Sequence, residues 1–308
     1  MLTKFAYLSV ILIWATTPLA IKWSSESVGF LFGITARMVL GMVVAYVIMI
    51  VLRQRMPWHR QAVYTYAAAG LGIYATMGSI YWGAQFIPSG WVSVVFGLSP
   101  IFTGALAAIS LKEDAFSRHK IIGIGLGLAG LVVVFGHGAN LGPDFIRGVV
   151  ACVFGTSTHA LSAVTVKRIN ANVGGFSLTA GGLSFAVPLL LLSFVLVDGW
   201  SLPTEIPLRA GLSILYLGIV SSAIGFALYY YILKRMPVSR VSMIALITPI
   251  MSLGLGNFFN GEPLSLAIIL GAGCIICGLL VYEFGPSLFN AIKNQTLIAR
   301  MLRRRYGN

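Results

Sequence analysis

The feature that most constrains this chain is an apolar segment that occurs twice in it. Moving the sequence by 149 positions superposes residues 88–113 on residues 237–262. The superposition pairs Pro88 with Pro237, Ser93 with Ser242, Ser99-Pro100-Ile101 with Thr248-Pro249-Ile250, and Glu113 with Glu262. Repeated apolar segments that proline interrupts are typical of membrane carriers, in which the binding site lies between the copies. The repeat therefore predicts a transporter before any substrate is considered.

The composition agrees with a chain that is built for lipid. Hydrophobic residues make up 58% of it and charged residues 9%, compared with about 45–50% and about 25% in soluble domains. A helix that crosses a bilayer needs about 20 apolar residues, and we count ten such runs. They cover residues 5–22, 29–52, 62–84, 88–111, 119–136, 145–166, 175–197, 208–233, 237–260 and 264–284. The sequence thus predicts an all-α integral membrane protein with ten transmembrane helices.

The ten predicted helices divide into two repeats of five. The first repeat covers residues 1–137, the second covers residues 145–285, and a basic tail follows at residues 286–308. Because five is odd, the second repeat enters the membrane from the opposite side, so the repeats are inverted and enclose a central cavity. The tail mixes apolar and basic residues, and we expect it either to lie on the inner leaflet as an amphipathic helix or to be unordered.

The placement of the basic residues predicts the orientation of the chain. If the first four residues are cytoplasmic, the outside segments contain only Lys22, Arg147 and Arg209, and Arg37 lies within a span. All other lysines and arginines fall on the cytoplasmic side, which is the distribution that the positive-inside rule describes. Both termini are therefore expected in the cytoplasm. The net charge of +13 does not indicate a nucleic-acid partner, because the charge is scattered over separate loops rather than gathered on one face.

Nothing in the sequence indicates an enzyme, a cofactor or a metal site. Cys152, Cys274 and Cys277 fall within predicted spans, so we expect no disulfide framework and interpret them as packing residues. The glycines of residues 123–130 imitate a dinucleotide-binding fingerprint, but no strand precedes them. Close packing of helices through small residues explains these glycines. No nucleophile with a neighbouring base is visible among the spans.

Two matched prolines predict the moving parts of the carrier. Pro100 and Pro249 lie about halfway along their predicted helices, where each removes a backbone donor and disfavours the preceding turn. Ser99 and Thr248 directly precede them and supply hydroxyls for the interrupted turn. We expect these four residues to form gating kinks beside the cavity. The alternative is a static kink that serves packing alone.

The other matched residues of the repeat favour structural roles. Pro88 and Pro237 stand in the first turn of their helices, where proline is common. Glu113 and Glu262 stand just before the next helix, where a carboxylate suits the positive end of the helix dipole. We expect these glutamates to be capping residues.

These motifs resemble the EamA-type domain of the drug/metabolite transporter superfamily. The resemblance rests on Leu98-Ser99-Pro100 and Lys112-Glu113 in the first copy, Ile247-Thr248-Pro249 and Gly261-Glu262 in the second, and Trp14, Lys22 and Arg37 near the start. The sequence departs from the family's pattern at His159 and at Ala180-Gly181-Gly182, which leaves the substrate open. The resemblance implies a ten-helix carrier of the bacterial inner membrane, often an exporter of amino acids or other small metabolites.

Four side chains are candidates for contact with a substrate. Arg37 lies about 12 Å below the outer surface at 1.5 Å per residue, and no acidic residue is expected at its depth. It is interpreted either as a ligand of a substrate carboxylate or of cavity water, or as a residue that bonds a helix carbonyl or reaches the interface. His159 lies mid-membrane and titrates near neutral pH, so it is assigned either proton coupling or substrate binding, or a structural bond to a carbonyl. The aromatic candidates are Trp14 and Tyr74.

The sequence predicts an inner-membrane transporter that exports a small organic metabolite, such as an amino acid, by alternating access. Its partners are the solute and the lipid bilayer; proton coupling and a homodimer stay open. Two alternatives remain: a passive facilitator or importer of the same fold, and a non-transporting membrane scaffold or sensor.

The predicted orientation can be tested with reporter fusions. A reporter that is active only in the cytoplasm should be active at both ends of the chain and inactive in the loop that carries Arg147. Activity in that loop, or an inactive reporter at either end, would contradict the topology.

Overall fold

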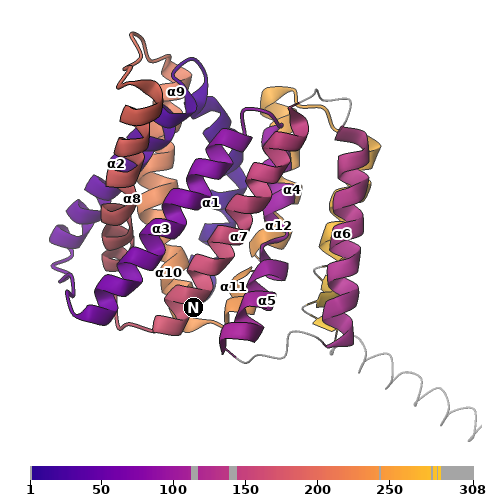
Figure 1. Ribbon diagram of the computed structural model, residues 1–308, viewed down its shortest axis with the longest axis horizontal. Helices are drawn as coiled ribbons and strands as arrows, with labels where there is room; N and C mark the ends of the chain where they lie inside the picture. The colour runs from indigo at the N-terminus through magenta and orange to yellow at the C-terminus, as the bar shows by residue number, and fades with distance from the viewer. Residues whose placement is uncertain are drawn as a thin grey trace, which may run out of the picture.

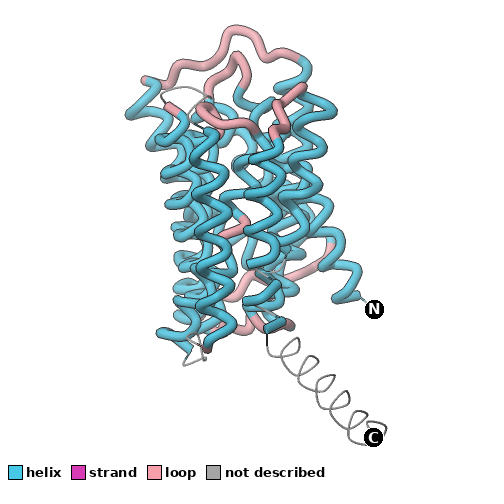
Figure 2. Tube along the Cα trace, turned by 90° about the vertical axis from the view of Figure 1, so that its right-hand side faces the viewer, coloured by secondary structure: helices cyan, strands magenta, loops and turns pink. Residues whose placement is uncertain are grey.

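The computed structural model describes residues 2–111, 117–138, 144–242, 244–278, 280–282 and 284–285, and every regular element in this part of the chain is a helix (Figure 1). The helices are α1 (Leu2–Ser25), α2 (Phe30–Val51), α3 (Arg60–Gly83), α4 (Ser89–Phe96), α5 (Ser99–Leu111), α6 (Arg118–Gly138), α7 (Phe145–Ile169), α8 (Gly175–Asp198), α9 (Leu208–Tyr216), the π-helical segment η2 (Leu217–Gly225), α10 (Phe226–Arg235), α11 (Val238–Ser242) and α12 (Ile244–Asn260). A further apolar helix covers Leu266–Tyr282. Figure 2 shows the long helices side by side, with the loops gathered at the two ends of the bundle.

Six helical segments are long and apolar enough to cross a membrane. They are Leu2–Ser25, Phe30–Val51, Ser89–Ser110, Phe145–Ile169, Gly175–Asp198 and Leu208–Arg235. The remaining long helices pack beside these six in the same bundle (Figure 1). The all-helical, multi-pass class is thereby confirmed, whereas the count of ten spans in two inverted repeats stays a prediction.

Glycines allow the helices of the bundle to approach closely. A Cβ atom on Gly70 of α3 would overlap the side chain of Phe185 and the carbonyl oxygen of Gly182 on α8. A Cβ on Gly83, at the other end of α3, would lie 2.7 Å from the carbonyl oxygen of Gly148 on α7. Because lipid gives helices no hydrophobic reason to associate, such close backbone contacts supply much of the attraction between them.

The first copy of the repeated segment is broken rather than kinked. The helix α4 ends at Phe96, Gly97 and Leu98 form a turn, and α5 begins at Ser99. The amide of Leu98 donates to the carbonyl of Val95 at 3.0 Å, which tightens the end of α4. Pro100 is the second residue of α5, a first-turn position that proline tolerates. The expected interruption is present, but it lies two to three residues before Pro100.

The second copy differs from the first. Pro249 lies inside α12, which continues from Ile244 to Asn260. Residue 243, between α11 and α12, lies outside the described residues. A kink was predicted at Pro249, and α12 continues through this residue without a break. Ser99 and Thr248 are buried, and each lines a cavity.

The two copies lie in contact and run in opposite directions. The hydroxyl of Ser93 on α4 donates to that of Ser252 on α12 at 2.8 Å. A Cβ on Gly90 would approach Leu253, whereas a Cβ on Gly97 would approach Ala245. Residue numbers therefore rise along α4 as they fall along α12, which makes the pair antiparallel.

A second contact between the halves has the form that a two-fold axis produces. A Cβ on Gly123 of α6 would lie 2.5 Å from the carbonyl of Gly278, and one on Gly130 would lie 2.6 Å from that of Gly271. After a one-residue slip, to a shift of 148 positions, the sequence repeat pairs Gly123 with Gly271 and Gly130 with Gly278. If the two halves are exchanged, the contact of Gly123 with Gly278 therefore becomes the contact of Gly271 with Gly130. An isologous interface has the same property.

The eighth predicted span contains an element that the sequence did not predict. Residues 208–233 were expected to form one helix, but the chain changes to a π-helix over Leu217–Gly225 and returns to an α-helix at Phe226. Wide π turns inside α-helices occur frequently at functional sites.

The glycine packing of α3 can be tested with two matched variants. Gly70→Ala should destabilise the protein by about 1–3 kcal/mol, because the added methyl group overlaps atoms of α8. Gly78→Ala on the same helix meets nothing within 4 Å and should leave stability unchanged. The measurement is the fraction of protein that stays monodisperse after heating in detergent. Equal losses for the two variants would refute the close contact.

Candidate functional site

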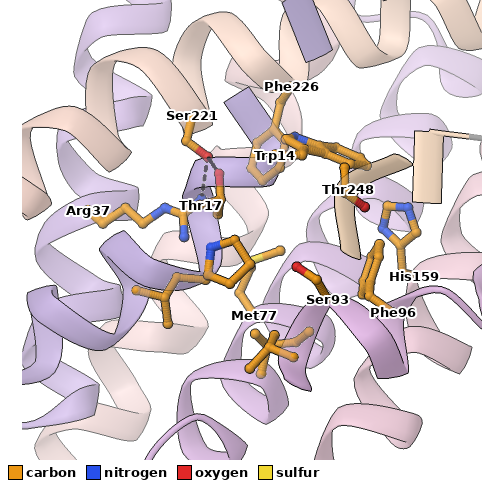
Figure 3. Close-up of a pocket in the computed structure, with 14 residues that line it drawn as sticks. Trp14, Thr17, Arg37, Met77, Ser93, Phe96, His159, Ser221, Phe226 and Thr248 are labelled. Atoms are coloured by element: carbon orange, nitrogen blue, oxygen red, sulfur yellow. Dashed lines mark hydrogen bonds between the residues drawn. The ribbon is translucent and has the colours of Figure 1, made fainter. Parts of the chain in front are cut away.

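A central cavity lies where the two halves of the chain meet (Figure 3). The centres of water molecules can occupy about 70 Å³ of it, so the cavity has room for several waters. Its lining comes from α1, α2, α3, α4, α7, η2, α10 and α12 and consists of Trp14, Thr17, Pro18, Ile21, Arg37, Met77, Ile80, Val92, Ser93, Phe96, His159, Ser221, Phe226 and Thr248. Figure 3 shows Arg37 and His159 at opposite sides, with Trp14 and Phe226 between them.

Arg37 forms the polar side of the cavity. Its side chain is 1% exposed. The Nε atom donates to Ser222 Oγ at 2.9 Å, Nη2 donates to Ser221 Oγ at 3.0 Å, and Nη1 lies 3.5 Å from the hydroxyl of Tyr81. The ion pairs among the described residues do not include Arg37. The arginine neither bonds a helix carbonyl nor reaches the interface; neutral hydroxyls hold it inside the bundle.

The π-helical segment explains why two neighbouring serines reach the same guanidinium. Successive residues of an α-helix point about 100° apart, so two adjacent side chains rarely share one partner. In η2 both Ser221 and Ser222 bond Arg37, and Thr17 on α1 shares a further bond of 3.0 Å with Ser221. Gly41 on α2 lets η2 come close, since a Cβ there would lie 2.7 Å from that of Ser222.

His159 forms the opposite side and joins three cavities. Its Nε2 atom lies 3.3 Å from the hydroxyl of Tyr229, and its ring centroid lies 5.0 Å from that of Phe96 and 5.8 Å from that of Trp14. It lines the central cavity, a second cavity toward α5 and α11, and a third between α3, α7 and α10. A bond to a helix carbonyl was the structural alternative for this residue, and the structure shows the Tyr229 hydroxyl instead.

The two aromatic candidates lie in different places. Trp14 lines the central and the second cavity, and its ring tilts by 33° against that of Tyr229 at 5.0 Å. Tyr74 lines none of the three cavities that His159 joins. Its hydroxyl shares a hydrogen bond of 2.8 Å with Ser193 on α8. The structure thus brings Trp14, Arg37 and His159 together and leaves Tyr74 apart.

Several residues of the site were missed from the sequence. They include Thr17, Ser221 and Ser222, which hold or flank Arg37, and Pro18, which lies within α1 and on the cavity wall. A signal was present, because hydroxyl pairs stand at Thr16-Thr17 and Ser221-Ser222 inside apolar spans. Polar residues within spans usually face the bundle interior or a cavity.

Glu262 fastens the end of the bundle where α4 begins. Its carboxylate accepts from the amide and hydroxyl of Ser89, both at 2.9 Å, and from the amide of Gly90 at 3.2 Å. Lys22 lies 3.8 Å away. A capping role was expected for Glu262, and the carboxylate caps α4 of the other half rather than the helix that it precedes. Glu113 and the tail of residues 286–308 lie outside the described residues.

Comparison with known proteins places the chain among transporters. The model of the EamA-like transporter family matches residues 2–136 and again residues 146–283. The uncharacterized transporter YoaV of Bacillus subtilis is 28% identical over 284 residues, which cover 90% of this chain and 95% of YoaV. A probable terminal-alkyne amino-acid exporter of Streptantibioticus cattleyicolor is 27% identical over 209 residues, or 67% of each chain. A protein of known crystal structure superposes with a TM-score of 0.68 at 21% identity, over 91% of this chain and 97% of the other, which shows a shared fold.

The Glu262 cap can be tested with two glutamate variants. Glu262→Gln should lower the free energy of unfolding by about 1–3 kcal/mol. The amide nitrogen of glutamine is a donor, so it cannot accept from the buried N–H groups of Ser89 and Gly90 as the carboxylate does. Glu26→Gln alters an exposed carboxylate 3.7 Å from Arg209 and should change stability by less than about 1 kcal/mol. Thermal unfolding in detergent measures both variants. A Glu262→Gln protein as stable as Glu26→Gln would show that the cap contributes nothing.

Proposed function

We propose that this chain, which belongs to the EamA-like transporter family, exports a small organic metabolite across the inner membrane by alternating access. An amino acid or a similar solute is the proposed cargo. The family match over both halves of the chain supports transport itself. The name of the Streptantibioticus relative, a probable amino-acid exporter, supports the direction and the class of solute.

The observation that carries the proposal is the central cavity that both halves line. It places a buried arginine, a histidine and a tryptophan around a space in the middle of an apolar bundle. Ionisable side chains inside a membrane are costly and mark solute or proton paths. We assign Arg37 and Trp14 to substrate binding, and His159 to substrate binding or proton coupling.

The cycle that we propose needs ten spans in two inverted repeats. The antiparallel contact of α4 with α12 supports this arrangement, as does the exchange of contacts between Gly123, Gly130, Gly271 and Gly278. In such proteins one bundle rocks against the other around a fixed site. The break before Pro100 and the segment around Pro249 act as hinges in this cycle, with Ser99 and Thr248 on the cavity walls.

The two ends of the bundle are fastened differently. Glu262 ties α4 to the end of α12, and Asn260 accepts from Trp23 and Arg209 at the same end. At the opposite end, the second cavity continues past His159 between α5 and α11. In the proposed cycle, the predicted topology places the Glu262 end outside and the end with the second cavity in the cytoplasm.

Transport can be tested by comparing the metabolites outside cells that lack or overproduce the protein. A solute whose external level follows expression is the cargo, and counterflow in liposomes, with and without a pH gradient, then separates coupled from passive movement. No change in any external solute would favour the scaffold or sensor alternative.

A matched pair of variants tests the assigned site. His159→Gln should lower the flux of that solute at least tenfold, because it removes a ring shared by three cavities. Tyr74→Phe removes a hydroxyl that lies outside the cavities and should keep wild-type flux. Normal flux through the His159→Gln protein would remove His159 from the site.

A further inference from the structure

The charge of Arg37 lacks a partner of opposite sign. A guanidinium has five N–H donors, and three of them meet the hydroxyls of Ser221, Ser222 and Tyr81. One donor on Nη1 and one on Nη2 have no partner among the described residues. The side chain is nevertheless 1% exposed and lies on the cavity wall. A buried cation with free donors favours an anion in the adjoining space, because only an anion supplies both the charge and the acceptors.

The other side of the same cavity is apolar and aromatic. The rings of Trp14, Phe96 and Phe226 line it together with His159, and Figure 3 shows them away from Arg37. The lining also includes aliphatic side chains, among them Ile21, Met77 and Ile80. The cavity is thus polar at one end, where Thr17 and Ser221 flank the guanidinium, and suited to a flat apolar group at the other.

A positively charged group finds no carboxylate in this space. None of the aspartates and glutamates among the described residues lines the central cavity. Glu262 is bound to Ser89 and Gly90 at the end of the bundle. Without a carboxylate, the ammonium group of an amino acid could bind only to the face of an aromatic ring, which stabilises a cation less than a carboxylate does. The like charge of Arg37 nearby would destabilise the ammonium group further.

We infer that the central cavity takes an organic monocarboxylate with an apolar, aromatic body and selects against the same body when it carries an ammonium group. The carboxylate lies at Arg37, Ser221 and Thr17, and the ring lies against Trp14 and Phe96. This inference rests on the proposed transport function. Within the proposed class, amino acids and similar solutes, it favours the solutes that are acids without a cationic group.

Three probes that share a phenylethyl group test the charge preference. The probes are 3-phenylpropionate, L-phenylalanine and phenethylamine, which carry a carboxylate, both groups, and an ammonium alone. Calorimetry on the wild-type protein in lipid nanodiscs should show 3-phenylpropionate binding at least tenfold more tightly than L-phenylalanine, and no binding of phenethylamine. L-phenylalanine binding equally or more tightly would overturn the inference, as would a lack of 3-phenylpropionate binding.

Matched arginine variants test the site. Arg37→Gln should weaken 3-phenylpropionate binding at least tenfold, and Arg37→Lys should retain part of it, because lysine keeps the charge without the two-pronged geometry. Arg147→Gln, at an exposed pair with Asp144, should bind like the wild type. Unchanged binding by Arg37→Gln would place the carboxylate elsewhere and overturn the assignment. If the Arg37 variants do not fold, Ser221→Ala tests the same site and should weaken 3-phenylpropionate binding severalfold. The ranking of the three probes on the wild-type protein needs no variant.

The failure of this inference is distinguishable from the failure of the proposed function. Cells that overproduce the protein reveal export of any solute, whatever its charge. Export of a zwitterion or amine together with no binding of 3-phenylpropionate would leave the transporter in place and remove the monocarboxylate preference.

Discussion

The centre of this molecule is organised around one buried charge. A charged side chain in the middle of a bilayer costs about 2.5–3.5 kcal/mol on insertion scales, and a hydrogen bond to a charged group contributes about 1.5–3 kcal/mol. The bonds from Arg37 to Ser221 and Ser222 are therefore of the size needed to keep the guanidinium inside the protein. Much of the local structure follows from this requirement. The chain widens into a π-helix to present two adjacent hydroxyls, and Gly41 removes the side chain that would hold α2 away from them.

The helices around this charge associate through their backbones. Gly70, Gly83, Gly123 and Gly130 each bring a helix to within contact of a neighbouring carbonyl, so the bundle is stiff where these contacts occur. The cavity lies where such contacts give way to larger side chains such as Trp14 and Phe96. A rigid frame with a softer aromatic interior is well suited to motion of whole helices, because the frame moves as a unit while the rings repack.

The sequence predicted the large-scale organisation well and the local geometry less well. Hydropathy and the repeat of residues 88–113 at residues 237–262 predicted helices that cross a membrane, and antiparallel contact between the two copies. Arg37, His159 and Trp14, which the sequence singled out, all line the central cavity, and the first two could be chosen because ionisable residues deep in a span are rare. The partners of Arg37 were missed, since serine is common in membrane helices and no periodic pattern announces a π-helix. Tyr74 does not line the central cavity, and the sequence could not show this because it does not reveal how a helix is rotated.

The break between α4 and α5 explains how the cavity can communicate with one end of the bundle. Phe96 is the last residue of α4 and packs against Trp14 and His159, so these three rings separate the central cavity from the second one. Beyond them, Ser99 and Thr103 on α5 face Ser242 on α11 across the second cavity. Because Gly97 and Leu98 already interrupt the helix, a rotation at these two residues would move Phe96 relative to α5. The Glu262 cap at the opposite end has no such weak point beside it, since its carboxylate binds the first amides of α4 directly. In the proposed cycle, we therefore expect the aromatic partition of Trp14, Phe96 and His159 to move before the capped end does.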